Sequence, residues 1–182
     1  MLLAATSGAV VWGLWSVDSS SDFDNFISFF GIGGAAFAIC VLFPHIRWDR
    51  FVYWRAVGVI LLSITAWIAA YNATIATPSF WTLGLSDVDW RELVPRVFVG
   101  SVVGAVIVLV GTPLIAGLNW SSRYLQIGVP AALLAGAPFV LTSMIDEEFR
   151  NLAEWWGIVQ YSIWHMTMAG VLHIVSSEKS LS

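Results

Sequence analysis

Three polar side chains share one face of the last apolar segment of the chain. Glu154, Tyr161 and His165 occur in "NLAEWWGIVQYSIWHMTMAGVLHIVSS" (151–177). At about 100° per residue of an α-helix they fall within about 40° of one another, so they form a polar stripe. Ionisable side chains in a membrane helix usually face the interior of the bundle, because contact with lipid is costly. We therefore expect the stripe to point into a helix bundle, where these residues are candidates for a ligand site or a proton path.

The same stripe also has a purely structural interpretation. Hydrogen bonds between membrane helices contribute on the order of 1 kcal/mol each. At 1.5 Å per residue, His165 lies roughly 20 Å from the start of this segment, and roughly 16 Å from Glu154 along the helix. We expect His165 to be buried and neutral, since burial disfavours the charged form and Glu154 is too far away for direct contact.

The sequence predicts no metal site and no cofactor. His165 and His173 are about 12 Å apart along a helix, so they cannot share one ion, and no HExxH motif occurs. The only lysine, Lys179, lies in the tail, which excludes a retinal Schiff base. The acidic stretch "DSSSDFDN" (18–25) is more typical of a helix-capping turn than of a cation loop. No GxSxG motif is present, so a serine hydrolase is not supported. Since no other catalytic motif is recognised, a non-enzyme is favoured.

The composition is that of a membrane protein. Of 182 residues, 58% are hydrophobic and only 11% are charged, whereas an average soluble domain has about 25% charged residues. The net charge of −4 leaves no basic patch for nucleic acid, so nucleic-acid binding is excluded. The single cysteine, Cys40, lies in an apolar run and is expected to pack as a small hydrophobic side chain.

Six apolar runs separated by charged residues predict the fold class: an all-α, polytopic transmembrane helix bundle in a single domain (1–182). A spanning helix needs about 20 mostly apolar residues. The runs are Leu2–Val17, Phe23–Phe43, Tyr53–Ala73, Val94–Leu118, Tyr124–Ile145 and Leu152–Ser176. The first run is short, and without it the chain would have five spanning helices. Within the fourth run, "GSVVG" (100–104) favours close packing against another helix of the same chain.

Basic residues predict the orientation, because they are enriched in cytoplasmic loops. With the amino terminus inside, the inner side holds Arg47, Arg50, Arg55, Arg123 and Lys179. The outer side then holds three arginines and ten acidic residues. Both termini are therefore predicted to be cytoplasmic. Tryptophans such as Trp48, Trp54 and Trp120 fall near the predicted membrane edges, where indole rings are favoured.

The order of these features resembles a known group: the six-helix family of damage-regulated autophagy modulators, Sfk-type proteins and FGF-receptor-activating (GPI-lipid-remodelling) factors. The similar segments are "SVDSSSDF" after the first run, "FPHIRWDR" after the second, and "AEWW" and "SIWHMT" in the last run. The chain lacks the outer-loop cysteines that members generally carry. The resemblance implies a lipid-related or non-catalytic membrane protein, with no active-site residues to transfer.

These observations favour a non-catalytic multi-pass membrane protein that is lipid-associated or acts as a scaffold. Its expected partners are membrane lipids, together with a second membrane subunit or another copy of the chain. Two alternatives stay open. One is a small transporter or channel with a polar path along the last helix, and the other is a membrane redox subunit that binds haem or quinone near His165.

Overall fold

A computed structural model describes residues 32–75, 90–143 and 150–178, and these residues are helical apart from short connectors. The long helices are α4 (Val52–Ile75), α6 (Trp90–Ala116), α7 (Arg123–Ser143) and α8 (Arg150–Glu178). A shorter helical segment precedes them, and it consists of α3 (Gly33–Phe37), the π-helical turn η2 (Ala38–Leu42) and the 3₁₀ turn η3 (Phe43–His45). Within the described ranges no residue is in a β-strand, so the all-α class is confirmed for them.

The described helices match five of the six predicted runs, with shifted ends. The first predicted run lies outside the described residues, as do residues 23–31 of the second. That second run was expected to end at Phe43, but its helical turns continue to His45. The π turn ends at Leu42, two residues before Pro44. Because proline has no N–H to donate, the regular hydrogen-bond ladder cannot continue through Pro44.

The fourth predicted run, 94–118, is also shifted. Its helix begins earlier, at Trp90, and ends earlier, at Ala116. The end is a Schellman motif: Gly117 has φ +80°, and the N–H of Leu118 donates to the carbonyl of Pro113 at 2.9 Å. Leu118 therefore belongs to the connector rather than to the helix, because the left-handed backbone of Gly117 stops the α-helix.

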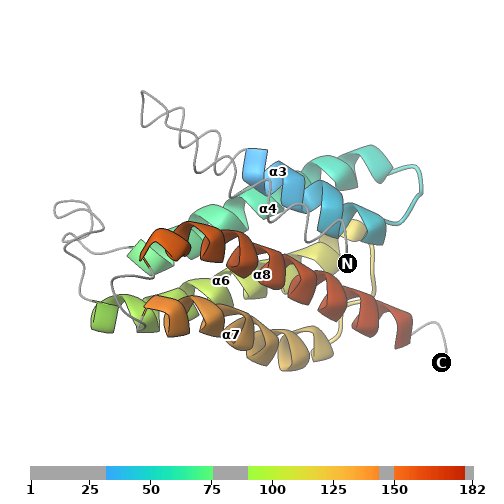
Figure 1. Cartoon of the computed structure of the whole chain (residues 1–182). Coiled ribbons are helices and arrows are strands. Elements are labelled where there is room, and N and C mark those ends of the chain that lie inside the picture. The colour runs from blue at the N-terminus through green and yellow to red at the C-terminus, as the bar shows by residue number, and fades with distance from the viewer. Residues whose placement is uncertain (1–31, 76–89, 144–149, 179–182) are drawn as a thin grey trace.

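The helices pack side by side in a closed order. α4 packs on α6, α6 on α7, α7 on α8, and α8 on η2, while α3 returns to α4. The connectors 46–51 and 117–122 and the end of α8 lie at the same end of the bundle (Figure 1). Neighbouring long helices thus alternate in direction. The core inside this ring includes Phe37, Leu42, Val59, Val108, Leu109, Met168 and Leu172.

Small residues let α4 and α6 approach closely. A Cβ atom on Gly100 would lie 2.7 Å from the carbonyl oxygen of Ala70, and one on Gly104 would lie 3.2 Å from the Ala70 side chain. Farther along the same pair of helices, a Cβ atom on Gly58 would lie 2.7 Å from Ile115. The intramolecular packing predicted for the "GSVVG" segment is therefore confirmed, and its partner is α4.

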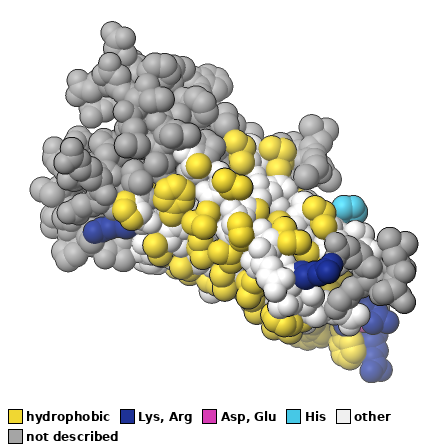
Figure 2. Space-filling model, turned by 90° about the horizontal axis from the view of Figure 1, so that it is seen from below, with side chains coloured by type: hydrophobic (Ala, Val, Ile, Leu, Met, Phe, Trp, Pro, Cys, Tyr) yellow, Lys and Arg dark blue, Asp and Glu magenta, His cyan; other side chains and the backbone are white. Residues whose placement is uncertain are grey.

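Two of the described helices are long and apolar enough to cross a membrane, namely Val52–Thr74 and Pro95–Ala116, and the apolar helix Gly33–His45 is shorter. Large hydrophobic side chains are exposed on the outside of the bundle. Leu61 on α4 is 59% exposed, Leu114 on α6 is 66% and Leu134 on α7 is 74%. Figure 2 shows one face on which hydrophobic side chains cover the middle and Lys or Arg side chains lie toward the two ends.

Candidate functional site

The imidazole of His165 lies in the interior of the bundle, on the side of α8 that faces α3 and α4. The side chain is fully buried, as are those of Met168 and Leu172, which continue the same face of the helix. The burial predicted for His165 is therefore confirmed. The side chains of its predicted companions on the stripe, Glu154 and Tyr161, lie outside the described residues, so the stripe as a ligand site or proton path stays a prediction.

Aromatic rings from three helices surround His165. Its ring centroid is 4.6 Å from that of Phe37 on α3, 5.8 Å from that of Trp67 on α4 and 5.9 Å from that of the neighbouring Trp164. Phe37 and Trp164 also contact each other, with centroids 5.4 Å apart. Tilted and edge-on pairs of this kind add about 0.5–1.5 kcal/mol each beyond the burial of their area. This aromatic cluster (Phe37, Trp67, Trp164 and His165) thus joins α3, α4 and α8.

This cluster was not predictable from the sequence, because its members are far apart in the chain. Phe37 and Trp67 each lie in the middle of an apolar run, where any aromatic residue is expected on composition alone. Helical periodicity assigns a residue to a face of its own helix, but it does not say which helix that face meets. Only the packing of α3 and α4 against α8 brings the rings together.

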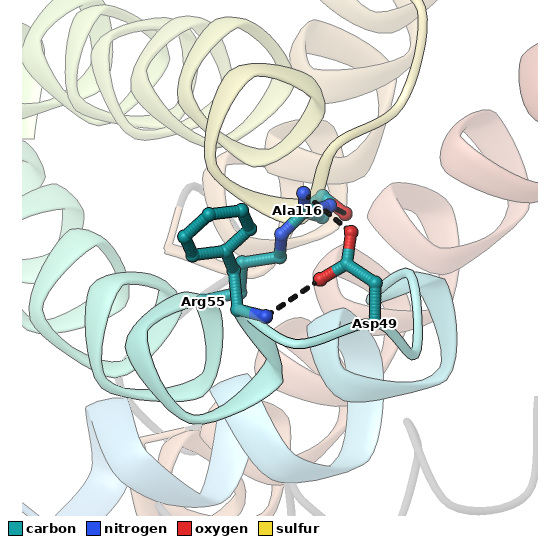
Figure 3. Close-up of polar contacts among 4 residues, drawn as sticks. Asp49, Arg55 and Ala116 are labelled. Carbon is teal, nitrogen blue, oxygen red and sulfur yellow. Dashed lines mark hydrogen bonds and ion pairs between the residues drawn. The ribbon is translucent and has the colours of Figure 1, made fainter.

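A second polar site joins the connector before α4 to the end of α6, as Figure 3 shows. Nη1 of Arg55 donates to the carbonyl oxygen of Ala116 at 2.7 Å, and Nη2 of Arg55 donates to Oδ2 of Asp49 at 2.9 Å. The backbone N–H of Arg47 donates to the same Ala116 carbonyl at 3.0 Å. A carbonyl at the carboxyl end of a helix has no partner within the helix and carries partial negative charge, so it suits a guanidinium.

Asp49 uses both carboxylate oxygens in this arrangement. While Oδ2 accepts from Arg55, Oδ1 accepts from the backbone N–H of Phe51 at 2.9 Å, just ahead of the first turn of α4. The side chains of Asp49 and Arg55 are only 28% and 17% exposed. An aspartate shortly before a helix is a recognised capping signal, so the role of Asp49 could have been found in the sequence "RWDRFVYWR". Its pairing with Arg55 is also predictable from this sequence, whereas the hydrogen bond from Arg55 to the Ala116 carbonyl is not.

The same end of the bundle carries His45, beyond the predicted span 23–43. Burial lowers the pKa of His45 below its ordinary value of about 6.5, and the nearby His173 on α8 lowers it further. His173 itself is exposed. Among the residues that the structure describes, no three His, Cys, Asp or Glu side chains gather in a group that could hold a metal ion.

Cys40 is partly buried and packs against the hydrophobic core, as predicted. The predicted interfacial tryptophans that are described, Trp48, Trp54 and Trp120, are 83%, 77% and 45% exposed. All three belong to the end of the bundle where the 46–51 and 117–122 connectors meet. Comparison of the chain with protein-family models found no match, and comparisons with curated proteins and with solved structures found none either.

Proposed function

We propose that this chain is a multi-pass integral membrane protein with six spanning helices and both termini in the cytoplasm, and that it acts without catalysis as a lipid-associated or scaffolding protein. The observation that carries the proposal is the outer face of α4. Tyr53 and Trp54 are 81% and 77% exposed in the first turn, and Val57 and Leu61, one and two turns farther on, are 49% and 59% exposed. Exposed aromatic rings at a helix end followed by exposed aliphatic side chains match the interface and the hydrocarbon layer of a bilayer.

The charges of the helices support the same proposal. In α4 the only charged residue is Arg55, in α7 the only one is Arg123, and in α6 none follows Arg96. Water would hydrate such uncharged faces poorly, since each Å² of exposed apolar area costs about 25 cal/mol relative to burial. Within a bilayer the same area is in contact with acyl chains, and that cost disappears.

Contacts of three polar side chains support a non-catalytic role. Arg55 and Asp49 hold two helix ends together, and the imidazole of His165 packs among three aromatic rings. Arginine, aspartate and histidine are also the residue types that catalytic and transport sites use, but these contacts stabilise the fold. The resemblance of four segments to the six-helix group, and of "SIWHMT" to its lipid-remodelling branch, favours a lipid-related role in the same way.

Quenching of a fluorophore tests the membrane part of the proposal. In a Cys40→Ala background, an NBD label is attached at Leu61→Cys on the outer face of α4, or at Asn119→Cys in the exposed connector after α6. With the protein in liposomes, brominated acyl chains should quench the label at position 61, and aqueous iodide should quench the label at position 119. Iodide quenching at position 61 would refute insertion of α4.

Lipid retention and flux test the functional part. Protein purified in mild detergent should retain phospholipid that mass spectrometry identifies, and liposomes containing it should show no more ion or proton leak than liposomes without it. A selective flux that the His165→Leu variant abolishes would replace this proposal by the transporter alternative. A chromophore or quinone that co-purifies with the chain would replace it by the redox alternative.

A further inference from the structure

The connector before α4 and the first turn of that helix place exposed arginines among exposed aromatic rings. We propose that this arginine–tryptophan surface binds the headgroups of anionic phospholipids. The inference rests on the proposed membrane function and names the lipid class that this end of the bundle selects. The surface is made of Arg47, Trp48, Arg50, Phe51, Tyr53 and Trp54, which are all exposed.

No ion pair to Arg47 or Arg50 occurs among the side chains that the structure describes. Asp49 is the only acidic residue between Ile46 and Ile75. Its two oxygens are already taken by Arg55 and by the backbone of Phe51. Arg47 and Arg50 thus present two positive charges to the outside, and they complement an anionic partner.

The chemistry of the two side chains fits a phosphate. A guanidinium is a planar group of N–H donors that can bind two phosphate oxygens at once, and it is more weakly hydrated than an ammonium group. The guanidinium carbon of Arg50 lies 4.8 Å from the centre of the Phe51 ring. This cation–π contact holds the charged group against a ring instead of leaving it on a freely moving side chain.

The aromatic side chains indicate where the charges lie relative to a bilayer. Trp48, Tyr53 and Trp54 are between 77% and 83% exposed. Amphipathic rings of this kind are favoured at the level of the headgroups. Because Arg47 and Arg50 alternate with these rings in sequence, the rings at headgroup level bring both guanidinium groups to the level of the lipid phosphates. A soluble anion would gain nothing from the rings, so a lipid is the partner that uses the whole surface.

The surface is also held in place by its backbone. The N–H of Arg47 is bonded to the carbonyl of Ala116 at the end of α6. The N–H of Val52 donates to the carbonyl of Asp49 at 3.0 Å, and the Asp49 side chain is held by Arg55. These bonds fix both ends of the short connector, so less conformational entropy is lost when a lipid binds.

Competition between two lipids tests the proposal. The full chain in detergent is mixed with equal amounts of phosphatidylserine and phosphatidylcholine, and native mass spectrometry measures the ratio bound. Each arginine at a membrane surface contributes a factor of about five toward anionic lipid. We expect the double variant Arg47→Gln/Arg50→Gln to lower the preference for phosphatidylserine about twenty-five-fold. Arg47→Lys/Arg50→Lys keeps the charges but loses the planar donors, and it should retain only part of the preference.

The matched control, Arg91→Gln/Arg96→Gln, removes two positive charges near the start of α6, at the end of the bundle away from the arginine–tryptophan surface. It should leave the preference for phosphatidylserine within about two-fold of the wild type. The proposal is overturned if the wild type binds both lipids equally, if the glutamine variant keeps its preference, or if millimolar inorganic phosphate displaces the phosphatidylserine. Failure of this inference alone leaves a protein that inserts and retains lipid without headgroup preference. Failure of the proposed function appears separately, as iodide quenching at position 61.

Discussion

The contact between Gly117 and Arg55 predicts a strongly coupled pair of substitutions at the end of α6. A Cβ atom on Gly117 would overlap the guanidinium of Arg55, and the backbone there has φ +80°. In Gly117→Ala, the left-handed backbone costs about 1–2 kcal/mol. The added methyl group also displaces Arg55 from Ala116 and Asp49, which costs about 1.5–3 kcal/mol for hydrogen bonds to a charged group. We expect a total loss of about 3 kcal/mol in the free energy of unfolding.

Arg55→Ala should lose about 2 kcal/mol, because it removes the same hydrogen bonds but leaves the Ala116 carbonyl bonded to the N–H of Arg47. Once the guanidinium is absent, the methyl group of Gly117→Ala has nothing to displace. The double variant should therefore lose about 3.5 kcal/mol, and not the sum of about 5 kcal/mol, which corresponds to a coupling of about 1.5 kcal/mol between the two positions.

The assay is a double-mutant cycle by denaturant unfolding in mixed detergent micelles, followed by circular dichroism. A matched control pairs Gly117→Ala with Thr65→Ala, an exposed position in the middle of α4, and this cycle should be additive. Additivity of the Gly117 and Arg55 substitutions within about 0.5 kcal/mol would contradict the described contact. A Gly117→Ala protein as stable as the wild type would contradict the Schellman ending of α6 as well.

Three further predictions concern the helix seam, the aromatic cluster and pH. Gly100→Ala should destabilise the protein by about 1–3 kcal/mol through overpacking against the backbone of α4. Gly136→Ala should cost less, because the nearest neighbour of its added Cβ atom would be a side-chain oxygen at 3.2 Å. Equal losses in thermal unfolding would argue against the close packing of α4 on α6. His165→Leu should lower the free energy of unfolding by about 1–2 kcal/mol, and His165→Phe should recover part of this loss by keeping the ring contacts. If His165→Phe recovers nothing, the imidazole nitrogens contribute more to stability than the ring contacts do. Because the pKa of His45 is lowered in the folded state, the contribution of this group to stability is fully present above about pH 6.5 and is lost as the pH falls through the lower folded pKa. His45→Gln should flatten this part of the stability profile. An unchanged profile would refute the role of His45.

Much of the fold was predictable from the sequence because hydrophobic periodicity is local. The apolar runs over 53–73, 124–145 and 152–176 became α4, α7 and α8 with ends shifted by a few residues. Capping residues account for two of the ends. Gly117 ends α6 before Leu118, and the Asp49 carboxylate accepts from the N–H of Phe51 just before α4. Glycine and aspartate at such positions can be recognised in the sequence, but a prediction based only on the length of apolar runs does not take them into account.

The candidate site was predictable only in part. The 3.6-residue period of a helix placed His165 on the buried side of α8 together with Met168 and Leu172, and all three are buried. The period could not supply Phe37 and Trp67, because those residues reach His165 from helices that are about 100 residues or more away in the chain, and no local pattern encodes that pairing.

The sequence by itself determined the all-helical class, the apolar composition of the runs and the side of α8 on which His165 lies, because these follow from residue type and helical geometry within one segment. The tertiary structure alone decided which helices meet. It placed Gly100 and Gly104 against α4, gathered the aromatic cluster around His165, and brought Arg55 to the carbonyl of Ala116, 61 positions away in the chain. The physical reason is that side-chain packing and the hydrogen bonds of helix ends depend on distances between segments, and the order of residues within a segment does not specify those distances.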